Sequence, residues 1–191
     1  IIDRHVSKAQ GVRVGPLSCL MAINRCVAPK SKRQTPDWYA GTALPQLLDL
    51  PAERVNYQLL TRALDYLDEE TQPAIEHELS YQLMVRHGVS LEWLLYDLTT
   101  TYFEGQHCPM AHQGRSKDHR PDCKQISFDL VVNHQPRFPI LHHTRPGNLA
   151  EARALEGTLK RLNEAYRRQG TLLVMDRNLS SHANLERVLK C

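Results

Sequence analysis

The hydrophobic periodicity of this chain changes near residue 91, and that change constrains the fold more than any other feature. Before it, apolar residues recur at helical spacing, most clearly over residues 60–67. After it, residues 91–103 form a run of aromatic, leucine and threonine residues, which is typical of a strand covered on both faces. We therefore expect a helical N-terminal region over residues 1–90 and a region of mixed strands and helices over residues 91–191.

The later region contains the patterns of three strands, a helix, a fourth strand and a last helix that runs to Lys190. Residues 123–132 alternate between polar and apolar and residues 138–143 form a further strand pattern. Short connections between these strands predict an antiparallel meander. The apolar stripe of residues 152–166 predicts a helix, and the apolar run at 171–175 predicts a buried strand of parallel type. The apolar face of the second strand consists of Ile126, Phe128, Leu130 and Val132.

Two aspartates stand where this arrangement would bring them together. Asp97 lies inside the apolar first strand, where an ionised carboxylate is costly unless it is paired or bound to a metal. Asp176 ends the fourth strand, at the edge where α/β sheets commonly present functional groups. A crossover can place the fourth strand beside the first, and two neighbouring carboxylates favour a hard cation. Taken alone, each aspartate is better explained as a structural residue.

Four motifs follow one another in a fixed order along the second region. They are residues 96–105 (Tyr-Asp-Leu-Thr-Thr-Thr-Tyr-Phe-Glu-Gly), residues 114–125 (Gly-Arg-Ser-Lys-Asp-His-Arg-Pro-Asp-Cys-Lys-Gln), residues 146–148 (Pro-Gly-Asn) and residues 174–177 (Val-Met-Asp-Arg). Together they resemble the catalytic domain of bacterial insertion-sequence DDE transposases. Residues 22–32 also resemble the helical region ahead of the catalytic domain in that group.

The resemblance implies a fold, an activity and a set of partners. The fold is α/β (α+β), with an N-terminal helical region followed by an incomplete ribonuclease-H-like domain. The activity is cleavage of DNA at the ends of an insertion sequence and joining of the 3′-hydroxyl to target DNA. Asp97 and Asp176 are then the catalytic and metal-binding residues of a two-metal site for Mg²⁺ or Mn²⁺. The implied partners are double-stranded DNA, at element ends and target, and a second copy in a homodimer, in the bacterial cytoplasm at the nucleoid.

The chain departs from the family pattern at its third catalytic residue. In the family this glutamate lies in a Y-x-x-R-x-x-x-E helix well beyond the second aspartate, whereas this sequence ends at Cys191. Glu186 falls in the short remaining segment without the surrounding motif, and we do not assign it. We therefore expect a truncated transposase that is inactive in strand transfer. The alternative is a non-catalytic fragment that binds DNA or inhibits transposition.

A basic loop follows the first strand and is a candidate DNA contact. Its four basic side chains belong to Arg115, Lys117, Arg120 and Lys124. Such a loop can hold phosphates near the scissile bond. The alternative is a solvated loop in which these cations pair internally with Asp118 and Asp122.

Two other groups of residues are better explained as structural. An irregularly spaced group suits a polar loop more than a zinc site, and it comprises His107, Cys108, His112, His119 and Cys123. Three aromatic residues of the first strand are expected in the core rather than stacked on bases, and they are Trp93, Tyr96 and Tyr102.

Composition narrows the class of protein. The 191 residues carry a net charge of +3; residues 1–36 hold seven basic residues and one acidic residue, whereas residues 37–80 hold two and nine. Residues 126–191 hold ten basic residues and six acidic ones, so two basic segments flank an acidic one. This suits a polyanionic partner, although ordinary charge fluctuation explains the pattern equally well. Five cysteines without a C-x-x-C pair favour the cytosol over a secreted disulfide scaffold. No apolar run approaches the roughly 20 residues of a membrane span.

Overall fold

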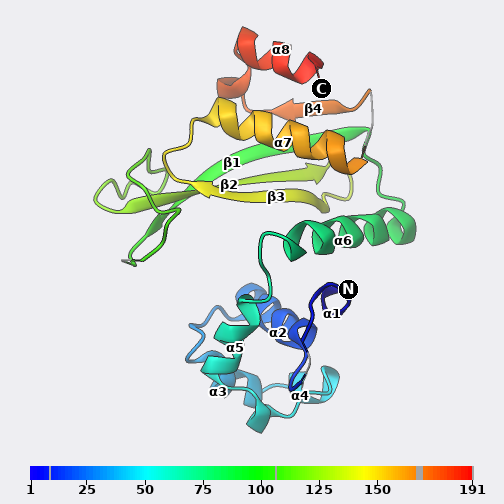
Figure 1. Ribbon diagram of the computed structural model, residues 1–191, viewed down its shortest axis with the longest axis vertical. Helices are drawn as coiled ribbons and strands as arrows, with labels where there is room; N and C mark the ends of the chain where they lie inside the picture. The colour runs from blue at the N-terminus through cyan, green and yellow to red at the C-terminus, as the bar shows by residue number, and fades with distance from the viewer. Residues whose placement is uncertain (9, 106, 167–169, 191) are drawn as a thin grey trace. The chain divides into compact units, whose positions relative to one another are not determined.

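The chain divides into two compact units, residues 1–79 and residues 80–191. The division falls inside helix α6 (Thr71–His87), which is followed by Gly88, a residue with a positive φ of 61°. No described helix is long and apolar enough to cross a membrane. The residues described by this computed structural model (Figure 1) are 1–8, 10–105, 107–166 and 170–190.

The first unit consists of short helices around one apolar core. Leu17 is buried together with Leu60 and Ala63 of helix α5 (Tyr57–Leu64). The apolar stripe predicted over residues 60–67 is shorter than expected, because that helix ends at Leu64. The elements before α6 are α1 (Ile2–His5), α2 (Val14–Val27), α3 (Thr35–Ala40), α4 (Leu44–Leu47), η1 (Ala52–Arg54) and α5 (Tyr57–Leu64).

The second unit is built on a four-stranded sheet. The strands lie in the order β3-β2-β1-β4; β1 pairs antiparallel with β2, β2 pairs antiparallel with β3, and β1 pairs parallel with β4. This confirms the predicted fold class, since a three-stranded meander with a parallel fourth strand beside the first is the ribonuclease-H-like order. The elements are β1 (Trp93–Phe103), β2 (Lys124–Asn133), β3 (Pro139–Pro146), α7 (Glu151–Tyr166), β4 (Leu172–Met175), η2 (Arg177–Leu179) and α8 (His182–Lys190).

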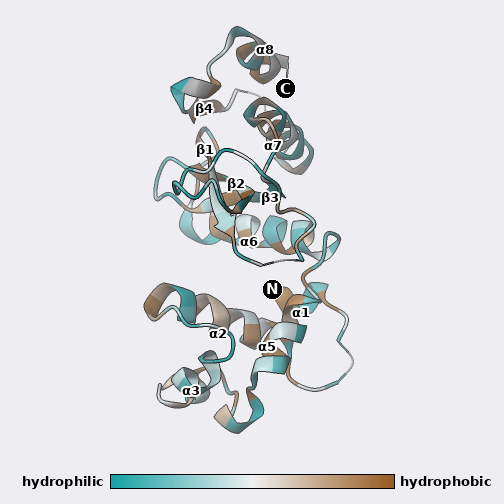
Figure 2. Cartoon of the chain, turned by 90° about the vertical axis from the view of Figure 1, so that its left-hand side faces the viewer, coloured by the Kyte–Doolittle hydropathy of each residue, from teal (hydrophilic) through white to brown (hydrophobic). Residues whose placement is uncertain are grey.

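Helix α7 covers one face of this sheet. Its residues Leu155 and Leu159 pack in one core with Leu94 and Tyr96 of β1 and Val131 of β2. Figure 1 shows α7 lying along the strands, and Figure 2 shows the hydrophobic segments of the strands in brown beside it. The apolar stripe of α7 was predicted correctly, and the sheet face against which it packs is the buried one.

The opposite face of the sheet is more open than the sequence predicts. Along β1, Leu94, Tyr96 and the following even-numbered residues up to position 100 are buried, whereas Asp97 is exposed. On β4, Val174 is 46% exposed. The predictions that both strands are covered on both faces are therefore wrong. The buried face of β1 packs against α7 in a core that also includes Leu83 of α6 and Val188 of α8, and the odd-numbered residues of β1 point to the opposite face.

Strand β2 buries the face that was not predicted. Leu130, which belongs to the apolar face of the alternating pattern, is 43% exposed, whereas its neighbour Asp129 is 1% exposed. The register explains this result, because Asp129 pairs with Leu98, which faces α7. Asp129 can be buried here because its carboxylate is hydrogen-bonded, which offsets the usual cost of its desolvation.

Candidate metal centre and nucleic-acid interface

The pairing of β1 with β4 determines where the two candidate aspartates lie. The parallel register ends with Tyr96 paired to Met175. The next residue along each segment is Asp97 on β1 and Asp176 after β4. Paired residues of neighbouring strands share a face, so a register that continued by one residue would bring Asp97 and Asp176 to the same level and the same open face. Both residues are exposed.

The Asp97 carboxylate is held toward the β4 edge of its strand. Its Oδ1 accepts a hydrogen bond from the backbone N–H of Leu98 at 2.8 Å. The carbonyl of Glu92 accepts from the N–H of Leu172, so even-numbered peptide groups of β1 point toward β4. Because strands repeat every two residues, the N–H of Leu98 points to that same edge, just beyond the end of β4. Exposure also removes the burial cost expected for Asp97, so its charge needs no partner for stability.

These two carboxylates fit a hard divalent cation. Mg²⁺ keeps several waters and is commonly bound by one or two carboxylates together with substrate phosphates. Asp97 and Asp176 supply oxygen ligands of that kind from neighbouring segments. Within the described part of the chain, no group of three or more His, Cys, Asp and Glu side chains is arranged to hold a metal ion. Glu186 on α8 pairs with His182 at 3.2 Å and stays unassigned.

The basic loop is attached to β1 close to Asp97. The Lys117 ammonium donates to the backbone carbonyl of Leu98, on the same strand edge as the Asp97 carboxylate. The backbone N–H of Lys117 donates to Thr100 Oγ1 at 3.1 Å, and that hydroxyl donates to the carbonyl of Arg115 at 3.2 Å. The loop is therefore positioned by the strand, and Lys117 is the predicted DNA contact that lies nearest to the carboxylates along β1.

Arg120 is paired within the loop. Its guanidinium donates to Asp122 through Nε and Nη2 at 2.9 and 2.8 Å and lies 4.8 Å above the ring centre of Tyr102. The hydrogen bonds from Arg120 hold the pKa of Asp122 well below its usual range. This is the internal pairing that the sequence left open for Asp122. In contrast, Arg115 and Lys124 are exposed and form no ion pair with a described residue.

Two of the sequence motifs, residues 114–125 and residues 146–148, pack against each other through their glycines, Gly114 and Gly147. A Cβ on Gly147 would lie 1.9 Å from the carbonyl oxygen of Gln125, and one on Gly114 would lie 2.1 Å from the carbonyl oxygen of Gly147. Gln125 is fully buried, and its amide nitrogen donates to the carbonyls of Arg120 and Cys123. Residues 114–125 and 146–148 therefore form one structural unit, which the sequence showed only as two separate motifs.

A buried ionic cluster, which sequence analysis missed, joins the sheet to α7. Arg145 Nε donates to Asp129 Oδ2 at 2.7 Å, Thr158 Oγ1 lies 2.8 Å from the same oxygen, and His143 Nδ1 lies 2.9 Å from Oδ1. Burial opposes ionisation of Asp129, but the hydrogen bonds from His143, Arg145 and Thr158 outweigh it and lower its pKa. Polar residues at two-residue spacing on β2 and β3 are the signal that marks this cluster.

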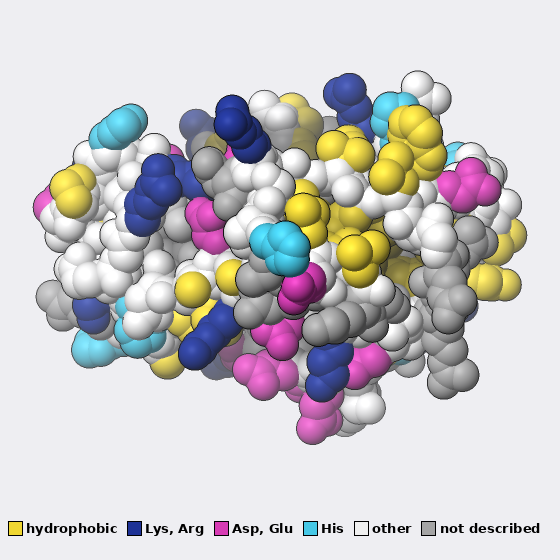
Figure 3. Space-filling view, turned by 90° about the horizontal axis from the view of Figure 1, so that it is seen from above, with side chains coloured by type: hydrophobic (Ala, Val, Ile, Leu, Met, Phe, Trp, Pro, Cys, Tyr) yellow, Lys and Arg dark blue, Asp and Glu magenta, His cyan; other side chains and the backbone are white. Residues whose placement is uncertain are grey.

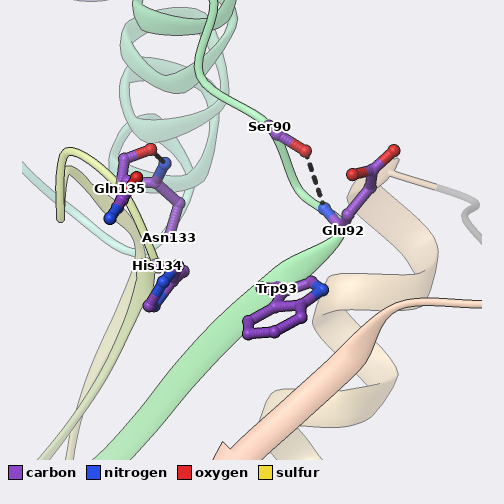
Figure 4. A pocket seen from close by; sticks show the side chains of 6 residues that line it. All are labelled: Ser90, Glu92, Trp93, Asn133, His134 and Gln135. Atoms are coloured by element: carbon purple, nitrogen blue, oxygen red, sulfur yellow. Dashed lines mark hydrogen bonds between the residues drawn. The ribbon is translucent and has the colours of Figure 1, made fainter.

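The aromatic residues of β1 do not behave alike. Tyr96 is in the core as predicted, whereas Trp93 is 51% exposed and Tyr102 is 38% exposed, so the core prediction is wrong for these two. The Trp93 ring lies 5.1 Å from that of His134 beside a hollow of about 360 Å³ at the start of β1 (Figure 4). Exposed hydrophobic side chains also gather on the face of the molecule drawn in Figure 3.

Comparison with known proteins gives remote likenesses only. No protein-family model and no curated protein matches the chain. Among solved structures it is similar to the Mos1 transposase paired-end complex with left transposon end (11% identity, TM-score 0.36) and to a pre-cleavage Mos1 transpososome (12%, 0.37). It is also similar to the mariner Mos1 paired end complex with Mg (14%, 0.31). Each overlap covers 96% of this chain and 59% of the Mos1 chain, so the chain spans less than two thirds of those proteins.

Proposed function

We propose that this chain carries part of the catalytic domain of a DDE transposase from a bacterial insertion sequence, with double-stranded DNA as its partner. The observation that carries the proposal is the register of β1 with β4, which ends one residue before Asp97 and Asp176. Support also comes from the ordered motifs of the sequence, two of which pack together as one unit. We further propose that the chain acts as a homodimer on DNA at the bacterial nucleoid.

In this proposal each group has a defined task. Asp97 and Asp176 hold Mg²⁺ or Mn²⁺ by their carboxylate oxygens, as the ligand preference of these ions requires. Such ions, when bound, activate an attacking oxygen and stabilise the leaving oxygen of a phosphodiester. Lys117, Arg115 and Lys124 contact phosphates of the DNA backbone and so position the strand. Arg120 acts indirectly, because its charge is already paired with Asp122.

The alternative proposal is a fragment that binds DNA without cleaving it. Two observations favour it: the assigned metal site comprises two carboxylates, and Glu186 is paired with His182. A two-metal site that lacks one carboxylate should bind metal weakly and position it poorly. We therefore propose that these 191 residues bind DNA but do not join strands by themselves.

The two proposals are separated by the effect of Mn²⁺ on DNA binding. If the carboxylates hold a metal against phosphate, Mn²⁺ tightens binding of a duplex that carries the element ends, and Asp97→Asn abolishes that tightening. Without metal, the same variant binds DNA equally well or better, because one negative charge near phosphate is removed. Asp65→Asn, an exposed aspartate at the end of α5, is the matched control.

Each result favours one reading. Tightening by Mn²⁺ that depends on Asp97 supports the metal site, and Mn²⁺-independent binding in every variant supports the DNA-binding fragment. Robust joining of DNA by the 191-residue chain would refute the claim that it is catalytically incomplete.

A further inference from the structure

We propose that a phosphate group binds in a cavity between the basic loop and the start of α7. The cavity has a volume of about 400 Å³ and lies on the α7 side of the sheet. It is lined by Thr100 of β1, Ser127 of β2, Arg115, Lys117 and the turn that precedes α7. It is distinct from the carboxylate pair, because Asp97 points to the opposite face of the sheet.

Two cationic residues line the cavity, Arg115 and Lys117, and the Thr100 hydroxyl holds the backbone of both. Lys117 is fixed through its backbone N–H to Thr100 Oγ1, and its ammonium donates to the carbonyl of Leu98, which also lines the cavity. Arg115 is exposed, and its backbone carbonyl accepts from the same Thr100 hydroxyl. A guanidinium beside an ammonium favours an oxyanion, and arginine suits phosphate because it can donate two parallel hydrogen bonds.

Ser127 is the observation that points to a ligand. The residue is 2% exposed, it lines the cavity, and its hydroxyl forms no hydrogen bond with any described residue. The Ser127 hydroxyl is therefore left to bond a group that enters the cavity, and a hydrogen bond to a charged group contributes about 1.5–3 kcal/mol. A phosphate oxygen in the cavity would accept a hydrogen bond from Ser127. Since the ligand must accept from a hydroxyl and two cations, an anion fits better than a neutral polar group.

The backbone around the cavity also favours an anionic ligand. Gly114 and Gly147 leave the turn without side chains where it passes the loop, and neither position has room for a Cβ. Helix α7 has 16 residues and begins at the cavity wall, where its free N–H groups favour a negative charge. Glu151 also lines the cavity and competes with an anion. We therefore expect millimolar affinity for inorganic phosphate, and tighter binding of a phosphate presented by DNA.

The first test uses inorganic phosphate and the whole 191-residue chain. Backbone amide signals are followed by NMR while phosphate is added at constant ionic strength. We expect saturable shifts around residues 113–117 and 147–151, with affinity reduced roughly tenfold in Ser127→Ala, because one hydrogen bond to a charged group is lost. Arg115→Ala is expected to weaken binding similarly. Lys160→Ala, which removes an exposed cation of α7 paired with Glu164, is the control and should change nothing.

Stability separates a ligand site from a structural role for Ser127. In urea unfolding without phosphate, Ser127→Ala should be about as stable as the wild-type chain, because its hydroxyl has no hydrogen bond to a described residue to lose. Loss of stability in phosphate-free buffer would show that the hydroxyl has a partner in the protein and would overturn the proposal. Equal phosphate affinity of Ser127→Ala and the wild-type chain would also overturn it.

The source of the phosphate is tested separately, and a DNA source rests on the proposed function. If DNA supplies it, Arg115→Ala lowers the slope of log affinity against log salt for duplex DNA by about one. If that slope is unchanged while Ser127-dependent binding of inorganic phosphate persists, the cavity serves a free phosphate-bearing ligand and the site still stands. Asp97→Asn should retain phosphate binding, so failure of the metal site and failure of this cavity give different results.

Discussion

Tyr96 of β1 and Met175 of β4 are the last paired residues of a parallel register, and an aspartate follows each of them. This relationship joins two segments that are 79 positions apart in the sequence. The Leu98 N–H holds the Asp97 carboxylate at the edge of β1 that β4 leaves uncovered. Lys117 reaches the same edge through the Leu98 carbonyl. A carboxylate pair and a phosphate-binding cation are thus proposed to share one end of the sheet.

The basic residues of the loop are expected to contribute unequally to DNA binding. Lys124→Ala should lower the slope of log DNA affinity against log salt concentration by about one, because an exposed and unpaired cation contacts phosphate. Arg120→Ala should leave the slope nearly unchanged, because Arg120 is neutralised by Asp122 and Glu104. Fluorescence anisotropy with a labelled duplex at several salt concentrations measures both slopes. Equal loss of slope in the two variants would show that the Arg120 ion pair opens on DNA.

The close approach of residues 114–125 and residues 146–148 predicts that Gly147→Ala strongly lowers the stability of the fold. The new Cβ would lie 1.9 Å from the Gln125 carbonyl oxygen, so the backbone of β2 or of the turn must move. We expect the free energy of unfolding to fall by about 3 kcal/mol, the upper end of the usual overpacking range. Gly41→Ala, where the nearest atom is 3.6 Å away, should cost less than about 1 kcal/mol. Urea unfolding followed by circular dichroism compares the two variants.

Asp129 is expected to make the second unit sensitive to acid. Its folded pKa is lowered, so the stability it contributes is present above the ordinary aspartate pKa of about 3.9 and is lost as the pH falls through the lower folded value. Asp129→Asn leaves Arg145 without its buried carboxylate and should cost about 3–5 kcal/mol at pH 7. Unfolding measured from pH 7 to pH 2 should show a smaller acid dependence in the variant. An unchanged acid dependence would assign that effect to other carboxylates.

Tyr96→Phe is expected to be neutral or stabilising. The Tyr96 hydroxyl is buried without a hydrogen-bond partner of good geometry, and burial together with the charge of Asp129 raises its pKa. Removal of the hydroxyl keeps the ring in the core and should raise the free energy of unfolding by up to about 1 kcal/mol. Thermal unfolding of the variant and the wild-type chain measures this difference. A clear loss of stability would mean that the hydroxyl is bonded to the Asp129 cluster.

The order of the strands was predictable because each strand carries a local pattern. The apolar run at residues 171–175 also predicted a parallel strand correctly. The buried face of β2 was not predictable in that way. Its apolar residues alternate regularly, but Asp129 is buried instead, because Arg145 and Thr158 lie 16 and 29 positions away and satisfy it.

The candidate site was also only partly predictable from local sequence patterns, as the open face of the sheet shows. Asp97 was singled out because a buried carboxylate would be costly, yet it is exposed. Periodicity gives the alternation of a strand, but which face is covered depends on the residues that pack against it from elsewhere in the chain. The proposed role of Asp97 therefore rests on its register with Asp176. That register is a non-local property which the local pattern of either strand does not contain.

The most direct test is a double-mutant cycle on Mn²⁺ affinity, measured by electron paramagnetic resonance of free Mn²⁺ in the presence of the chain. If Asp97 and Asp176 hold the same ion, Asp97→Asn and Asp176→Asn each weaken binding, and the double variant is little worse than either single variant. Asp65→Asn should bind Mn²⁺ like the wild-type chain. Single losses that add fully in the double variant, or a loss in only one of them, would contradict a shared metal site.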